Sequence, residues 1–261
     1  MMSLPDPWHP LRGLTAARIA LGRSGSSLPT GAHLEFQLAH ARARDAVHHL
    51  ADLDAVAAQV SAASLETVRL ATAAGDAATF LKRPDLGRRL DDASREILQG
   101  RHAGQGSDLA IVLADGLSGL AVELHAAPLA IALTQRLAGE GWRVAPISIV
   151  RHGRVAVGDE IGELLGARLV VVLIGERPGL SAPDSLGAYL TFAPRIGLTD
   201  EKRNCVSNIH GAGLSYDEAA FKIAWLVREG LARGITGVAL KDESGTALIA
   251  ARPTIDTKPD R

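Results

Sequence analysis

The sequence is poor in cysteine and in aromatic residues, and it has no excess of either charge. It contains 261 residues, of which one is a cysteine (Cys205) and 3% are aromatic, and its formal net charge is −1. A single cysteine excludes an internal disulfide framework and fits a cytosolic protein. Because there is no basic excess to neutralise a phosphate backbone, we do not expect the chain to bind nucleic acid.

Long apolar runs and a secretory signal are missing as well. No stretch approaches the roughly 20 apolar residues of a membrane-spanning helix. Residues 1–9 lack the basic and apolar regions of a signal peptide, so a cytoplasmic location is expected. The chain is nevertheless 47% hydrophobic. These residues are mainly aliphatic and include many alanines, a composition that favours helices and can supply a substantial core.

One uninterrupted apolar run, from Leu169 to Ile174, ends abruptly at the turn residue Gly175. Such a run predicts a parallel strand that is buried on both faces. Ligands of open α/β sheets bind at the carboxyl ends of such strands, and this is where Glu176 and Arg177 follow in the chain. A carboxylate and a guanidinium at that edge can hold a polar ligand. The alternative is that Glu176 belongs to a surface ion pair.

The second part of the chain alternates between strand and helix patterns. Strands are expected at residues 108–114, 143–150, 169–175 and 186–196, and helices at residues 117–137, 159–165 and 216–233. This alternation predicts a doubly wound parallel sheet of the Rossmann-like type.

The first part of the chain lacks this alternation. Residues 1–14 read as an arm, residues 64–72 give a mixed signal, and helices are expected at residues 15–23, 32–49, 52–62 and up to about 98. Thr30 is a candidate cap for the second of these helices, whose apolar stripe is Leu34, Leu38 and Ala41. Three glycines within residues 99–107 mark the best boundary. We therefore expect a mainly helical N-terminal domain (residues 1–100) and a Rossmann-like C-terminal domain (residues 101–261).

The segment 115–119, Asp-Gly-Leu-Ser-Gly, follows the first strand of that domain and opens a helix. Nucleotide phosphates bind at this position in Rossmann-like folds. The segment is neither G-x-G-x-x-G nor a P-loop, so it is either a tight strand–helix turn or a ligand-facing loop. A stand-alone nucleotide-using enzyme, with Asp115 and His210 as an acid–base pair, remains an alternative.

Two further patterns allow more than one interpretation. Cys205 lies in a polar segment, residues 203–211, where it is either a small apolar contact residue or a nucleophile paired with His210. One helical stripe carries His33, Gln37, His40, Arg44 and His48. It is a solvated face, a partner interface of a non-catalytic interaction module or, because acidic and Cys ligands are missing, a weak metal candidate. We predict no metal site.

Five segments taken together, in order along the chain, resemble one known family. They are residues 34–48, 83–90, 113–118, 173–180 and 205–210. On these segments the chain is similar to the small (light) subunit of ethanolamine ammonia-lyase.

The resemblance implies a subunit of an adenosylcobalamin-dependent enzyme that converts ethanolamine to acetaldehyde and ammonia. In this family the large subunit is a (β/α)₈ barrel that binds the substrate, and the small subunit covers the cobalamin from the other side. The N-terminal helical part contacts the large subunit. The chain would then carry no catalytic residue and act within a hetero-oligomer, in the cytoplasm or inside a bacterial microcompartment.

The family pattern, carried onto this sequence, gives three cobalamin contacts: Val155, Glu176 and Cys205. Leu117 stands where a histidine-ligated cobalamin protein has its histidine in Asp-x-His-x-x-Gly, so the cofactor should keep its own base on cobalt. The tail after Ala239 is longer than the resemblance implies, and we assign it no function.

Overall fold

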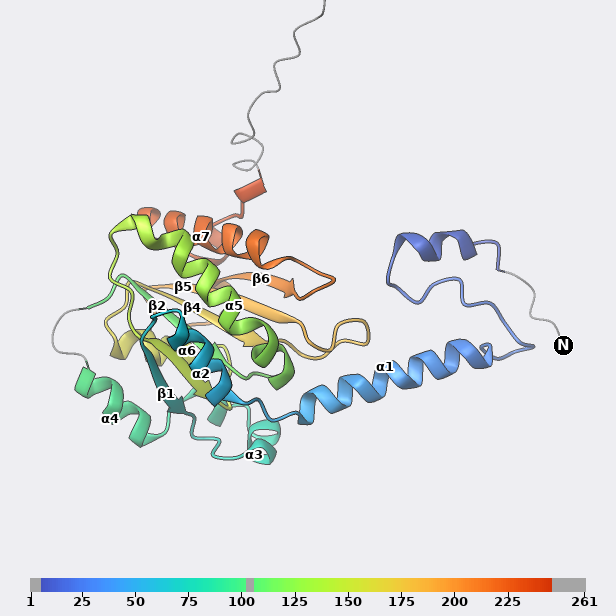
Figure 1. Ribbon diagram of the computed structural model, residues 1–261, viewed down its shortest axis with the longest axis horizontal. Coiled ribbons are helices and arrows are strands. Elements are labelled where there is room, and N and C mark those ends of the chain that lie inside the picture. Colours follow the sequence, from blue (N-terminus) through green and yellow to red (C-terminus); the bar gives the residue numbers. More distant parts are fainter. Residues whose placement is uncertain (1–5, 102–105, 246–261) are drawn as a thin grey trace, which may run out of the picture.

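The computed structural model describes residues 6–101 and 106–245. Within these residues, six strands form one sheet in the order β1-β3-β2-β4-β5-β6, with helices on both faces (Figure 1). The strands are β1 Thr67–Ala71, β2 Leu109–Ala114, β3 Ile147–Arg151, β4 Leu169–Gly175, β5 Leu186–Phe192 and β6 Arg203–Ile209. The predicted α/β architecture is therefore confirmed.

The sheet is mixed, which corrects the prediction that it is parallel throughout. β1, β3, β2 and β4 are parallel, whereas β5 is antiparallel to β4 and β6 is antiparallel to β5. The reason lies in the connection between β4 and β5, residues 176–185, which contains no helix. A parallel neighbour needs a long crossover, while an antiparallel neighbour can follow a simple loop.

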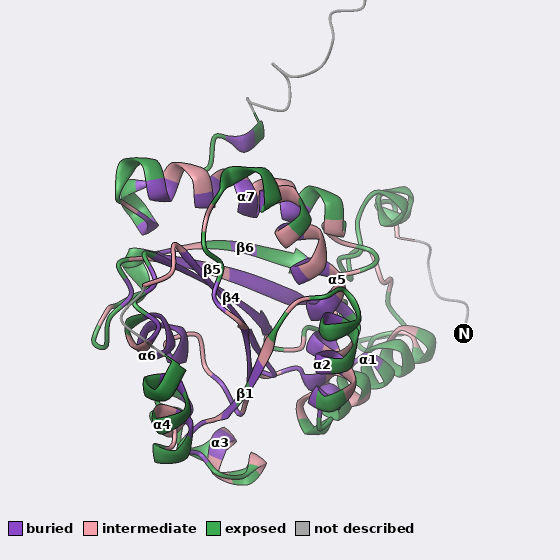
Figure 2. Cartoon of the chain, turned by 60° about the vertical axis from the view of Figure 1, so that its left-hand side comes forward, coloured by how far each residue is buried: buried purple, intermediate pink, exposed green. Residues whose placement is uncertain are grey.

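Helices cover the two faces unequally (Figure 2). They are α1 Thr30–His48, α2 Leu53–Ala62, α3 Ala77–Lys82, α4 Asp92–Arg101, α5 Gly119–Leu137, α6 Val157–Leu164 and α7 Tyr216–Arg233. Short 3-10 turns occur at His9–Leu14, Leu86–Arg88, Ala138–Glu140, Asp200–Lys202 and Gly237–Ala239. Buried residues of α2, α5 and α7 share one hydrophobic core, and those of α4 and α6 share the other.

The central strands explain why two cores exist. Every residue of β2 and β4 is buried. Leu109, Ile111 and Leu113 of β2 belong to the core beneath α5, and the alternating Ala110, Val112 and Ala114 belong to the core beneath α6. Because successive side chains of a strand point to opposite faces, a strand that is apolar throughout needs cover on both sides. The sheet is doubly wound around this pair.

The N-terminal part contributes to the same sheet. β1 lies in the segment that gave a mixed signal, and it pairs with β3 in the register Thr67↔Ile147. The sheet therefore contains strands from both sides of residue 100. The predicted division into two domains at this residue stays a prediction.

Other expectations differ from the structure in detail. No helix forms at residues 15–23, and α1 begins at Thr30 after Pro29 without a side-chain cap. Asp52 caps α2, since its Oδ1 accepts hydrogen bonds from the amides of Asp54 and Ala55. β6 was not predicted, because its burial pattern is mostly polar and exposed.

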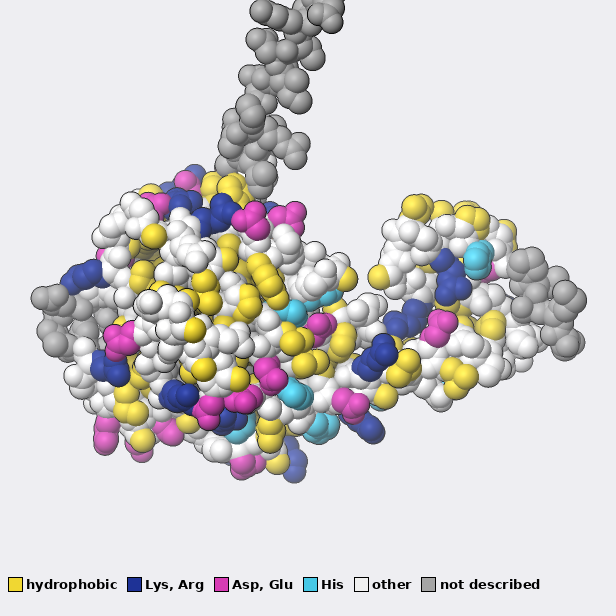
Figure 3. All heavy atoms as spheres, viewed as in Figure 1, with side chains coloured by type: hydrophobic (Ala, Val, Ile, Leu, Met, Phe, Trp, Pro, Cys, Tyr) yellow, Lys and Arg dark blue, Asp and Glu magenta, His cyan; other side chains and the backbone are white. Residues whose placement is uncertain are grey.

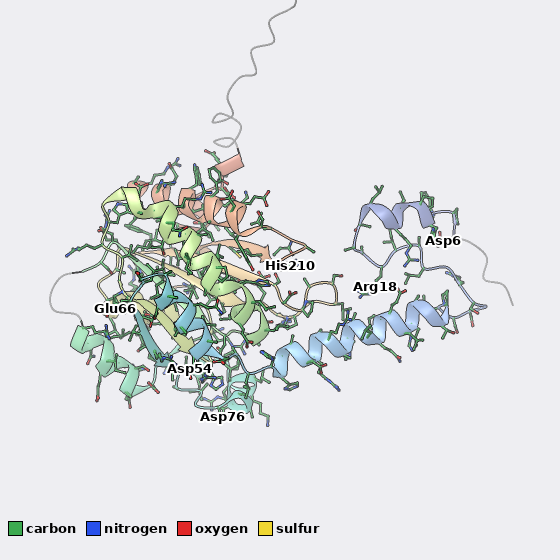
Figure 4. The ribbon with its side chains drawn as sticks, in the orientation of Figure 1. Asp6, Arg18, Asp54, Glu66, Asp76 and His210 are labelled. Atoms are coloured by element: carbon green, nitrogen blue, oxygen red, sulfur yellow. The ribbon has the colours of Figure 1, made fainter. Side chains whose placement is uncertain are left out.

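An arm formed by residues 6–29 and α1 projects from the body of the protein (Figure 1). α1 buries only Ala39 and Ala46, while Leu34 and Leu38 are 57% and 52% exposed. The predicted apolar stripe thus lies on the surface, and hydrophobic side chains are visible along this arm (Figure 3). Arg18, labelled in Figure 4, donates a hydrogen bond to the Leu180 carbonyl on the body (3.2 Å).

No helix in the described part of the chain combines the length and the apolar composition required to cross a membrane.

The ends of β2 and β4 pack backbone against backbone. Gly116 has φ +61°, and a Cβ at this position would lie 2.3 Å from the Gly175 carbonyl oxygen. The Leu117 amide donates a hydrogen bond to that same oxygen (3.0 Å). Only glycine fits such a contact, because any side chain would meet both the carbonyl and an unfavourable backbone conformation.

We predict that Gly116→Ala lowers the free energy of unfolding by about 3 kcal/mol, the combined scale of a left-handed non-glycine residue and an overpacked contact. Urea denaturation of the purified chain measures this effect. The matched control is Gly100→Ala in α4, where a Cβ meets nothing within 4 Å. This control should be neutral or slightly stabilising. Equal stability of the two variants would contradict the close contact.

Candidate functional site

A groove lies at the carboxyl ends of the parallel strands, on the face covered by α6. It consists of a pocket of about 430 Å³ and a neighbouring pocket of about 390 Å³ that share Arg154, Val155 and Tyr189 as lining residues. We call this pair of pockets the edge groove. Its first pocket is also lined by Leu117, Glu176 and Arg177, and its second pocket by Arg88, Asp200 and Arg203.

A larger hollow of about 640 Å³ adjoins the edge groove and reaches Arg95 of α4. It contains none of the cofactor contacts predicted from the sequence. Its buried carboxylates are both paired, Asp159 with Arg203 and Glu160 with Arg95. We therefore consider the edge groove as the candidate site.

Glu176 is the first residue after β4 and is held in a fixed orientation. Its amide donates to the Ser185 carbonyl (2.9 Å), and its Oε2 accepts hydrogen bonds from Ser185 Oγ (2.5 Å) and from the Asn208 amide (3.4 Å). Its Oε1 accepts none from the described residues. A Cβ at residue 187 would lie 2.8 Å from this oxygen, so the absence of a side chain at Gly187 leaves room for the Glu176 carboxylate. Glu176 forms no ion pair with any described residue. The alternative that it belongs to a surface ion pair is therefore not supported by these contacts.

Val155 is positioned by a buried carboxylate at the end of β2. Asp115 Oδ2 and Oδ1 accept hydrogen bonds from the amides of His152 (2.8 Å) and Gly153 (3.0 Å). Burial raises the pKa of the Asp115 carboxyl, and these two amide bonds partly oppose that increase. Asp115 thus fixes the loop after β3, and Val155 packs against the core beneath α6.

Arg154, which precedes Val155, is half-buried beside Phe80. Its guanidinium carbon lies 4.3 Å from the Phe80 ring centroid, and its Nη2 donates to the Phe80 carbonyl (3.2 Å). Its Nε is buried without a hydrogen-bond acceptor. Burial lowers the pKa of Arg154, and the nearby charges of Arg88 and Arg177 act in the same direction.

Cys205 lies on β6 directly opposite Tyr189 of β5. Desolvation raises the pKa of both the Tyr189 hydroxyl and the Cys205 thiol. The thiol is therefore protonated at neutral pH. His210 bonds instead to Asn208 Oδ1 (2.9 Å) at the end of the strand. No hydrogen bond joins Cys205 to His210, which lies beyond the end of β6, so the described contacts do not support the alternative nucleophilic pair.

The segment 115–119 and the stripe on α1 have structural explanations. Ser118 caps α5 through the Ala121 amide (3.2 Å) and donates to the Pro183 carbonyl (2.9 Å). This occupies the helix N-terminus that a nucleotide phosphate would need. Both Asp115 oxygens are taken by backbone amides, which disfavours an acid–base role with His210. The stripe on α1 is exposed at all five positions, and the described residues contain no group of three potential metal ligands.

The structure therefore brings the three predicted contact residues around Tyr189. Val155 and Glu176 line one pocket with it, and Cys205 lies opposite it on the neighbouring strand.

Comparisons with known proteins agree along almost the whole chain. The family model of the ethanolamine ammonia-lyase light chain (EutC) matches residues 5–241. The small subunit of ethanolamine ammonia-lyase from Azotobacter vinelandii is 59% identical over 93% of this chain and 90% of the relative. Those from Xanthomonas campestris and Pseudomonas syringae are 55% and 56% identical, over 97% and 92% of this chain and 94% and 84% of the relatives.

The chain belongs to the ethanolamine ammonia-lyase small-subunit family. The resemblance found in the sequence is confirmed, and the match includes the arm, the sheet and the edge groove. Membership makes the chain one subunit of a carbon–nitrogen lyase, and the term small subunit implies a heteromeric partner.

Sequence reasoning missed two lining residues of the edge groove in this ethanolamine ammonia-lyase subunit, Arg154 and Tyr189. It also missed Ser185, which holds Glu176 in place. Arg154 is adjacent to Val155 and could have been found as a charged residue in the short loop after a buried strand. Tyr189 is a polar-tipped aromatic in the middle of an apolar strand, a pattern typical of a partly exposed position. No signal in the sequence indicates that Ser185 returns to Glu176.

We predict that Asp115→Asn loosens the loop at residues 152–155, because the amide places one donor against a backbone N–H. The free energy of unfolding should fall by about 1–3 kcal/mol, the scale of a lost buried hydrogen bond to a charged group. Amide hydrogen exchange of this loop should also accelerate. The matched control is Asp45→Asn on the exposed surface of α1, and unchanged exchange in the Asp115 variant would refute this role.

Proposed function

We propose that this chain forms one side of an adenosylcobalamin site in an ethanolamine ammonia-lyase that converts ethanolamine to acetaldehyde and ammonia. The proposal extends membership of the family to a specific surface of this chain. The observation that carries it is the unpartnered Oε1 of Glu176, a fixed acceptor at the ligand-binding edge of the sheet.

The residues of the edge groove fit the periphery of a corrin ring. Corrin side chains end in amides, whose N–H groups need acceptors, and a carboxylate makes hydrogen bonds about twice as strong as a neutral group does. Glu176 would hold such an amide through Oε1. Val155 would supply an apolar contact, and the neutral Cys205 thiol with Tyr189 a weakly polar one. When bound, adenosylcobalamin supplies the radical chemistry, and these residues bind and orient it.

Leu117 lines the same pocket and has no nitrogen to offer a metal. This agrees with the expectation that the cofactor keeps its own base on cobalt.

The arm provides the second half of the proposal. Leu34, Phe36 and Leu38 of α1 and Trp8 and Leu14 of the arm are all exposed. Exposed apolar side chains grouped in this way mark protein interfaces. We propose that the arm and α1 contact a large subunit, which binds the substrate and supplies the catalytic residues. The N-terminal hundred residues would then mainly serve assembly and the remainder the cofactor, in an enzyme of the cytoplasm or of a microcompartment within it.

The purified chain alone should release no ammonia from ethanolamine in the presence of adenosylcobalamin. Addition of the large subunit should restore ammonia release, because substrate binding resides there. A coupled ammonia assay measures both states, and omission of adenosylcobalamin is the control. Turnover by the isolated chain would overturn this division of labour.

Glu176→Gln should weaken cobalamin binding by the assembled enzyme by about 1–3 kcal/mol, the usual scale for a hydrogen bond to a charged group. The Gln oxygen can retain Ser185, which leaves the amide nitrogen, a donor, in place of the free acceptor. Equilibrium binding of cobalamin, followed by its visible absorbance, measures the change.

The control for this experiment is Glu201→Gln, the same substitution at an exposed residue outside the edge groove. Unchanged affinity of the Glu176 variant, with fold and assembly intact, would remove Glu176 from the site.

A further inference from the structure

Three arginines line the edge groove without a carboxylate partner. Arg88 ends the 3-10 turn Leu86–Arg88, Arg154 follows β3, and Arg177 follows β4. Of these, Arg88 and Arg177 are exposed and Arg154 is half-buried. None forms an ion pair with any residue that the structure describes, although other arginines of the body, such as Arg95, Arg168 and Arg203, do.

The carboxylates around the groove are already engaged. Glu176 holds Ser185, Asp200 lies 3.3 Å from Arg203 Nε, and Asp115 accepts two backbone amides. Asp85, in the adjoining hollow, is paired with Arg83 at 2.7 Å. Among the described residues, no carboxylate therefore forms an ion pair with any of the three arginines.

Exposed arginines are often simply solvated, with the charged head in water. Arg154 differs from that default. Its position is fixed by the Phe80 ring and by the bond from Nη2 to the Phe80 carbonyl, its Nε is buried without an acceptor, and its Nη1 forms no hydrogen bond with a described residue. A half-buried cation without an ion-pair partner is costly. A bound anion would remove that cost.

We propose that Arg154, Arg88 and Arg177 bind a phosphate group in the edge groove. Guanidinium groups are suited to this ligand because their planar N–H donors match phosphate oxygens, and three arginines from three separate segments can approach different oxygens. Two sources share this chemistry. One is the phosphodiester in the nucleotide loop of cobalamin, and this source rests on the proposed function. The other is free inorganic phosphate.

The test compares two corrinoids on the assembled enzyme: cyanocobalamin, and dicyanocobinamide, which lacks the nucleotide loop and its phosphate. Arg154→Gln should weaken cyanocobalamin binding by about tenfold or more, and Arg88→Gln and Arg177→Gln by about threefold each. Dicyanocobinamide affinity should stay within about twofold. Arg195→Gln is the matched control, an exposed arginine outside both pockets of the groove. The ³¹P resonance of bound cyanocobalamin should shift between the unmodified enzyme and Arg88→Gln, which reports on the phosphate itself.

The second arm titrates inorganic phosphate into the full-length chain by calorimetry. Binding that Arg154→Gln abolishes, with equal effects on both corrinoids, would support the site and identify free phosphate as its source. Equal losses for both corrinoids without phosphate binding would overturn the inference, as would variants that weaken only subunit assembly or change nothing. The exposed Arg88 and Arg177 keep the test valid if Arg154→Gln does not fold. Failure of the unmodified enzyme to bind either corrinoid would contradict the proposed function. In that case the phosphate titration alone decides whether the three arginines form a phosphate site.

Discussion

The central strands β2 and β4 allow no water on either face, and this constraint organises the rest of the molecule. Their side chains alternate between two cores, so α2, α5 and α7 must cover one side and α4 and α6 the other. At the carboxyl ends, the backbone after β2 packs so closely against the end of β4 that a side chain on Gly116 or Gly175 would collide with a carbonyl oxygen of the other segment. The polar residues that follow, Asp115 and Glu176, are consequently held on rigid supports rather than on free loops.

The edge groove divides its work between neutral and charged groups. On the side of β5, the Tyr189 hydroxyl lines the groove, and the Cys205 thiol lies next to it on β6. Both stay neutral because desolvation raises the pKa of both groups. At the ends of β3 and β4, Arg154 and Glu176 supply opposite charges on separate segments. A large ligand with an apolar ring and polar side groups matches this division better than a small polar substrate does.

The buried elements could be predicted from the sequence pattern, whereas the partly exposed ones could not. β4 was predicted at its observed bounds because an apolar run with turn residues has few other structures. β6 was missed because its exposed polar side chains hide the period of a strand. The antiparallel direction of β5 depends on a connection without a helix, which a strand pattern does not encode. Glu176 was predicted from its place at the end of a buried strand, whereas Val155, Cys205 and the cobalamin role of all three residues came from a family resemblance. Arg154 and Tyr189 were recognised only once the fold placed them beside these residues.

The arm has a mechanical consequence. A helix of 19 residues such as α1 is about 28 Å long, and along this length it is tied to the body near its C-terminal end and by the Arg18–Leu180 hydrogen bond. One exposed hydrogen bond contributes only about 1 kcal/mol. A rotation of about 10° near residue 49 would move the far end by about 5 Å over that length. The body therefore sets where the arm starts, and the few contacts of the arm with the body only weakly fix the direction in which it projects.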